Sequence, residues 1–134
     1  MSQAHLQVVR DLYAEWSQGN FRVGLDYFDP ELRFVLDGAI TPTPGEWHGV
    51  DGMRDAWREG LSTWDEYRTG PIEHLLESKD QVAAFNRMHG RGKRSGVDTD
   101  SRLWAAVFTF RDGKIVKLLL TDLAGALEAV GLRE

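Results

Sequence analysis

Two side chains that could do polar chemistry, Arg87 and His89, stand two residues apart in a segment with the pattern of a strand. Successive strand residues point to opposite faces, so both should project from one face, together with Ala83 and Phe85. An arginine near a histidine in an apolar cup could bind an anion or a carbonyl oxygen, and the imidazole could act as a general base. The alternative is that both face solvent or a second copy of the chain, and the spacing leaves both interpretations open.

Two aspartates are further candidates for acid–base work. Asp122 follows the leucines at 118–120, where partial desolvation would suit it to proton transfer. It also stands directly before a predicted helix, and N-capping is the preferred interpretation. Asp37 alternates with Phe34 and Leu36, so it points outward if those two point inward. That orientation argues against Asp37 as an isomerase base.

The sequence offers no evident metal site. Its histidines show neither the helical nor the strand spacing of paired ligands: His5, His48, His74 and His89. There is no cysteine, which excludes disulfides and thiolate ligands. We therefore expect no metal or other cofactor.

Length and composition indicate one soluble domain. The chain has 134 residues, which suits a single domain over residues 1–134. A net charge of −5 makes nucleic acid a poor partner. No apolar run reaches the ~18 residues of a membrane span, and the N-terminus lacks the order of a secretory signal. We expect a cytoplasmic protein without membrane contact.

The first half of the chain reads as helices around one strand. Leu6, Val9, Tyr13 and Trp16 recur at helical spacing. A short second helix over residues 21–28 should end at Asp29-Pro30. Alternation over 32–36 predicts a strand, residues 38–45 a loop, and the stripe of a third helix follows: Met53, Trp57, Leu61 and Trp64.

The second half reads as antiparallel strands. We predict strands over 72–77, 81–92, 97–111 and 114–121, with a tight turn at Asp112-Gly113 and a short helix over 124–130. Helices on one face of a curved antiparallel sheet make an α+β domain, and the open end of such a sheet is the default place for a ligand.

Several segments in this order resemble the SnoaL-like branch of the nuclear transport factor 2-like superfamily. They cover most of the chain: residues 13–20, 47–54, 91–97, 110–116 and 122–132. The resemblance implies a cone-shaped α+β barrel with a curved, mainly antiparallel sheet, three N-terminal helices and a short C-terminal helix. It also implies a homodimer through the outer sheet face and a small, mostly apolar molecule inside the cone.

The superfamily includes polyketide cyclases, ketosteroid isomerases, limonene-epoxide hydrolases and plain binding domains, and fold alone does not choose among them. The epoxide-hydrolase branch has an Arg-x-Asp pair where this chain has Arg87-Met88-His89. The resemblance also implies an acid near the last strand, where this chain has Asp122.

The leading hypothesis is a domain that binds a small hydrophobic molecule, with or without cofactor-free acid–base chemistry. Arg87 would orient a carbonyl or epoxide oxygen while His89 or Asp122 moved the proton. The predicted pocket walls are mostly aromatic: Tyr13, Trp16, Trp57, Phe85, Trp104 and Leu118. The alternatives are a limonene-epoxide-hydrolase-like enzyme and a non-catalytic binding or dimerisation domain.

Overall fold

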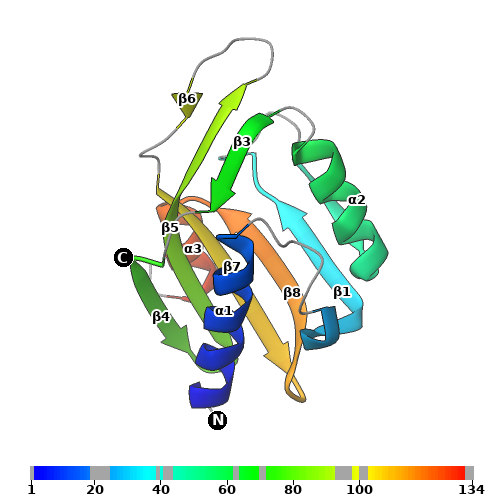
Figure 1. Cartoon of the computed structure of the whole chain (residues 1–134). Coiled ribbons are helices and arrows are strands. Elements are labelled where there is room, and N and C mark those ends of the chain that lie inside the picture. The colour runs from blue at the N-terminus through cyan, green and yellow to red at the C-terminus, as the bar shows by residue number, and fades with distance from the viewer. Residues whose placement is uncertain are drawn as a thin grey trace.

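The fold combines three α-helices with one large sheet (Figure 1). The computed structural model describes residues 2–18, 25–38, 40, 44–61, 64–69, 72–92, 98–99 and 103–131. Its helices are α1 (Ser2–Trp16), the 3-10 turn η1 (Leu25–Tyr27), α2 (Gly49–Leu61) and α3 (Leu123–Ala129). Its strands are β1 (Phe28–Leu36), β2 (Gly45–His48), β3 (Trp64–Thr69), β4 (His74–Ser78), β5 (Gln81–Gly92), β6 (Asp98–Thr99), β7 (Leu103–Arg111) and β8 (Lys114–Thr121).

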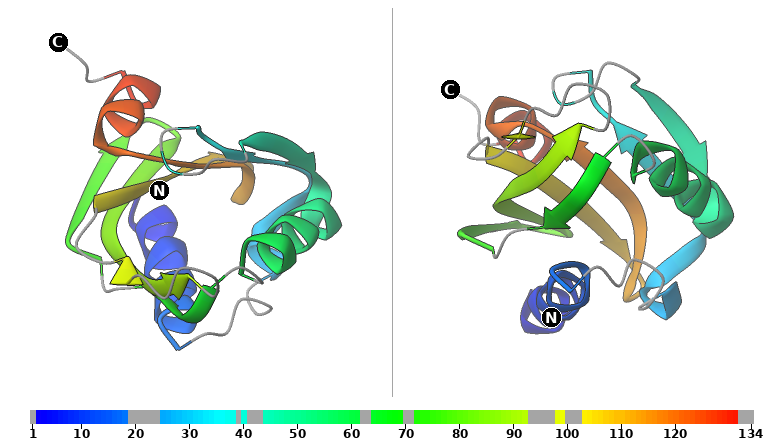
Figure 2. Two further views of the ribbon diagram at one scale, coloured as in Figure 1. Left: turned by 90° about the horizontal axis from the view of Figure 1, so that it is seen from above. Right: turned by 45° about the horizontal axis from the view of Figure 1, so that its top comes forward.

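The sheet runs in the order β2-β1-β8-β7-β5-β3, and β4 and β6 each pair with part of β5. Strand β5 pairs with four strands, β3, β4, β6 and β7, because its 12 residues are more than any one of these partners covers. The pairing is antiparallel throughout except between β1 and β8, which run parallel. The sheet is curved and does not close, so the predicted α+β cone is confirmed (Figure 2).

The larger core lies on the concave side of the sheet, which α1 and α2 cover; we call this the inner face. Helix α1 buries Val9, Leu12, Tyr13 and Trp16 there, because steps of three and four place them on one side of the helix. The sheet contributes large side chains that are fully buried: Phe34, Phe108, Ile115 and Leu118.

The opposite side of the sheet, the outer face, carries a smaller core under α3. Ala83, Phe85, Ala105 and Val107 from β5 and β7 pack against Ala126 and Val130 of the C-terminal segment. Strands β5 and β7 are therefore buried on both faces. In many antiparallel sheets, by contrast, one face packs on the core and the other contacts solvent.

Two strand predictions match the structure residue for residue, namely 81–92 and 114–121. The predicted turn at Asp112-Gly113 is also confirmed, since both residues have positive φ, 53° and 79°. Such a pair of left-handed residues suits a tight hairpin connection.

Other boundaries were wrong, and they cluster at short elements. The predicted second helix gives way to a strand at Phe28, with Asp29 and Pro30 inside β1. The stripe of the third helix stops at Leu61, because Trp64 begins β3. The predicted strand 97–111 is two strands, β6 and β7, and β2 lies partly in a predicted loop. Residues 19–24 and 93–97 lie outside the described residues.

No helix in the described ranges combines the length and apolar character that crossing a bilayer requires.

Candidate functional site

A continuous set of aromatic rings lines the inner face. The Trp16 ring stands 5.1 Å from those of Tyr13 and Trp57, and 6.1 Å from Phe108 on β7. Leu118 is fully buried on β8, directly opposite Phe108 in the strand register. The structure therefore brings together four of the predicted wall residues: Tyr13, Trp16, Trp57 and Leu118.

A buried polar pair interrupts this apolar surface. The Tyr13 hydroxyl donates to Asn86 Oδ1 at 3.3 Å, although Asn86 is 2% exposed and its α1 partner 5%. Asn86 lies on β5 in step with Val82 and Ala84, which both belong to the inner core. Burying an amide among apolar side chains costs free energy unless it is hydrogen-bonded, and the tyrosine supplies one such bond.

Trp104 lies next to this pair on the neighbouring strand. It is the register partner of Asn86, so the two side chains share a face. Its Nε1 is buried, and it has no hydrogen-bond partner among the described residues. Leaving a buried donor unsatisfied costs roughly 1–3 kcal/mol. Trp104 was predicted as a wall residue; strand alternation puts its side chain on the same face as Ala106 and Phe108, although the inner core cluster does not include it.

An open groove of about 770 Å³ reaches Tyr13 of the polar pair from outside. It runs between α1 and the segment that leads into β4, and Tyr13 belongs both to this groove and to the inner core. The residues that line it mix apolar and charged side chains: Arg10, Tyr13, Ala14, Ser17, Ile72, Glu73, His74 and Leu75.

The structure does not bring Phe85 to the inner face, and Arg87 meets the groove only through its ion pair with Glu73. Phe85 packs in the outer core beneath α3, and Arg87 shares its side of β5. The Arg87 Nε lies 3.2 Å from Glu73 Oε2, and the two side chains are 42% and 36% exposed. The position of Phe85 differs from the predicted pocket wall because β5 has apolar residues on both faces, so its alternation does not say which face the helices cover. For Arg87 the sequence left the pocket and the solvent interpretations both open.

The other proton-transfer candidates have different surroundings. Asp122 caps α3, accepting from the Gly125 amide at 2.9 Å, which is the interpretation preferred from sequence. Asp37 accepts from the Thr121 hydroxyl at 2.6 Å and so points to the outer side, as predicted. The side chain of His89 lies outside what the structure describes, while its backbone pairs with Arg68 of β3.

Asn86 is the residue that sequence reasoning missed. The predicted pocket face of this strand carried Ala83, Phe85, Arg87 and His89, and the alternation therefore put Asn86 on the opposite face. The available signal was a single amide in a strand segment whose same-side neighbours, Val82 and Ala84, are apolar.

Within the described ranges, no three histidine or carboxylate side chains come together as a metal-binding group.

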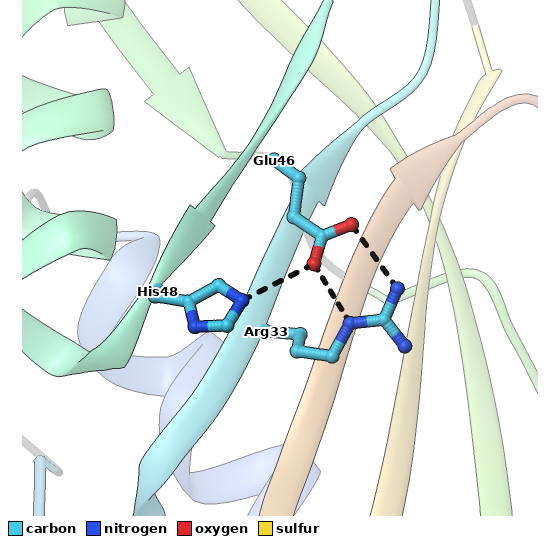
Figure 3. A network of polar contacts seen from close by, with 3 residues as sticks. All are labelled: Arg33, Glu46 and His48. Carbon is cyan, nitrogen blue, oxygen red and sulfur yellow. Dashed lines mark hydrogen bonds and ion pairs between the residues drawn. The ribbon is translucent and has the colours of Figure 1, made fainter.

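The outer face carries a separate polar cluster on β1 and β2 (Figure 3). Arg33 donates to both oxygens of Glu46, at 2.8 and 3.1 Å, and His48 Nε2 lies 3.5 Å from the same carboxylate. The hydrogen bond from Arg33 lowers the pKa of Glu46 below its ordinary value, and the same bond raises the pKa of Arg33. The cluster is exposed and far from the inner rings, because Phe34 and Trp47 alternate with it on the other side.

Comparison with known proteins identifies the architecture. The family of SnoaL-like domains matches residues 9–118. An NTF2-like protein of unknown function from Burkholderia pseudomallei has a TM-score of 0.77 at 18% identity, over 95% of this chain and 97% of that one. TerC, co-crystallised with polyporic acid, has a TM-score of 0.76 at 16% identity, over 95% and 97%.

A putative SnoaL-like polyketide cyclase from Jannaschia sp. has a TM-score of 0.75 at 16% identity, over 98% of this chain and 94% of that one. Identities this low establish a shared fold and nothing about the ligand. Among curated proteins no match was found.

Proposed function

The chain belongs to the family of SnoaL-like domains, and we propose that it binds a small hydrophobic molecule on the inner face of its sheet. The ligand enters by the groove beside Tyr13 and lies against the rings of Trp16 and Trp57. Aromatic walls suit a flat apolar molecule, because stacked and edge contacts add to the gain from burying its surface.

One observation carries this proposal: a buried polar pair stands where an open groove meets an aromatic core. Tyr13 takes part in all three features, as a groove residue, as a core residue and as the donor to Asn86. Ligand sites are typically apolar clefts with a few placed polar groups, and this arrangement fits that description. The TerC complex with polyporic acid supports it further, since a protein of this fold holds a small organic molecule.

Binding without reaction is the form that the described residues favour. Of the groups predicted to move or orient a proton, Asp122 caps α3, and Arg87 is on the Phe85 side of β5 and lies 3.2 Å from Glu73. Likewise, Asp37 accepts a hydrogen bond from Thr121. The side chain of His89 lies outside what the structure describes.

A homodimer through the outer face is part of the proposal, and α3 already covers the region of that face around Phe85.

The binding proposal is tested with 2-ethylnaphthalene, measured by equilibrium dialysis against the purified chain. Ala14 is exposed and lines the groove, so A14W should fill the entrance and weaken binding at least about tenfold. Ala4 is exposed on the same helix and does not line the groove, so A4W is the matched control and should bind as the wild type does. Equal affinity in A14W and A4W would remove the groove from the proposal.

Acid–base chemistry on the bound molecule is the second candidate, supported by the putative polyketide cyclase among the structural neighbours. A panel of epoxides and polyketide-like ketones separates the two forms. We expect no turnover above background. Turnover that A14W abolishes and A4W preserves would establish the enzymatic form instead.

A further inference from the structure

Trp104 carries a hydrogen-bond donor on the inner side of the sheet, and no described residue accepts a hydrogen bond from it. Its Nε1 is buried without a partner, and its register partner is Asn86. Most buried indole N–H groups in proteins find an acceptor, so an exception beside a candidate ligand site calls for an explanation.

Asn86, the polar residue opposite Trp104 in the strand register, does not provide that acceptor. Asn86 Oδ1 accepts from the Tyr13 hydroxyl at 3.3 Å, and the Asn86 amide nitrogen contacts the Arg87 carbonyl at 3.4 Å. The orientation of the Asn86 amide is therefore set by two hydrogen bonds, one from Tyr13 of α1 and one to the backbone of its own strand, β5. The amide oxygen is turned to the tyrosine, and the indole N–H of Trp104 has no acceptor in the part of the chain that the structure describes.

We propose that the ligand supplies this acceptor: a carbonyl oxygen on the hydrophobic molecule accepts from Trp104 Nε1–H. The inference rests on the proposed function and narrows its ligand to carbonyl-bearing aromatic compounds. A carbonyl fits better than a cation such as an ammonium group, because an indole nitrogen can only donate and the ligand must supply the acceptor. Trp104 then fixes the orientation of the ligand, while the inner rings supply the affinity for its apolar part.

The test compares two ligands of the same shape, 2-acetylnaphthalene and 2-ethylnaphthalene, against the wild type and W104F. Phenylalanine keeps an aromatic ring and removes the donor. We expect W104F to bind the ketone about tenfold more weakly than the wild type does, equivalent to ~1.4 kcal/mol, and to bind the hydrocarbon within about twofold. The ratio of the two changes cancels the different hydration of the two ligands.

A matched control is L103V, whose side chain packs toward the outer core from the adjacent position of β7. It should change neither affinity by more than about twofold. Equal weakening of both ligands in W104F would make Trp104 a packing residue and overturn the inference, as would no change for either. If the wild type binds the hydrocarbon but not the ketone, the inference fails and the proposed function stands. If the wild type binds neither, the proposed function fails and this inference fails with it.

A second readout does not depend on the variant folding. The chain has five tryptophans, so a wild-type sample labelled with ¹⁵N at the indole positions gives few signals. The ketone should move one indole proton downfield, as a new hydrogen bond does, and the hydrocarbon should leave that proton at its free position. Identical shifts with both ligands would show that no indole donates to the carbonyl.

Discussion

A glycine in the last helix gives the sharpest prediction about stability. Gly125 lies in α3, and a Cβ built there would overlap with the Thr121 hydroxyl and stand 3.1 Å from the Thr121 Cβ. That hydroxyl is the donor to Asp37, in a 2.6 Å bond between the end of β8 and the residue after β1. The substitution G125A therefore forces Thr121 to move and breaks the bond.

The magnitude follows from three opposing effects. In an ordinary helix, alanine is preferred over glycine by about 1 kcal/mol. Overpacking a well-filled site costs about 1–3 kcal/mol, and a lost hydrogen bond to a charged group costs about 1.5–3 kcal/mol. Partial relaxation of Thr121 reduces the last two costs, and we expect G125A to lower the free energy of unfolding by about 2 kcal/mol net.

Urea unfolding of four proteins checks this: the wild type, G125A, T121A and the double variant. T121A removes the hydroxyl that the new methyl group would meet, so adding G125A to it should cost less than about 1 kcal/mol. The coupling between the two positions is the decisive quantity. Stabilisation by G125A in the wild-type background, as at an ordinary helical glycine, would refute the packing described for α3.

Three further outcomes are expected. D122A should lose about 1 kcal/mol of stability in urea because the helix cap is gone, and D122N should recover most of it, whereas equal losses would argue against capping. F85A should lose about 3 kcal/mol while its affinity for 2-ethylnaphthalene stays within about twofold of wild type; weakened binding would return Phe85 to the ligand site. The pKa of Glu46, followed by carbon NMR, should lie below its ordinary value of 4.5 and rise in R33Q. Because that pKa is lowered by folding, the pair stabilises the protein above the ordinary pKa and loses its effect as the pH falls through the lowered one; an unchanged titration in R33Q would contradict the ion pair.

The long strands and the hairpin could be predicted because their signals are local. Residues 114–121 carry three β-branched residues, Ile115, Val116 and Thr121, and Asp112-Gly113 fixes the turn before them. The first helix was equally clear, since its apolar spacing extends to Trp16.

The short strands could not be predicted because their partners define them. β2 has four residues and becomes a strand by pairing with β1, and Trp64 leaves the helical stripe because β3 pairs with β5. No local pattern carries that information, and pairing between distant segments overrides propensity.

Only the helical part of the candidate site could be predicted from the sequence, for a related reason. The helical spacing of Tyr13 and Trp16 is enough to predict that they lie on the buried side of the first helix, and both belong to the inner core. The face of β5 is different, because Phe85 and Ala84 are both apolar and both buried. Only the placement of α3 behind the sheet distinguishes the two faces, and with it the position of Asn86 relative to the helices.

The parallel pairing of β1 with β8 has a consequence for the order of events during synthesis. Phe34 and Leu118 stand opposite each other in that ladder, although most of the chain separates them. Closing so long a loop is slow, and until it closes β1 has only β2 beside it. A nascent chain stalled before Lys114 leaves one edge of β1 open to the solvent, which is the condition under which chaperones are recruited. The hairpin of β7 and β8 is thus the segment that completes the middle of the sheet.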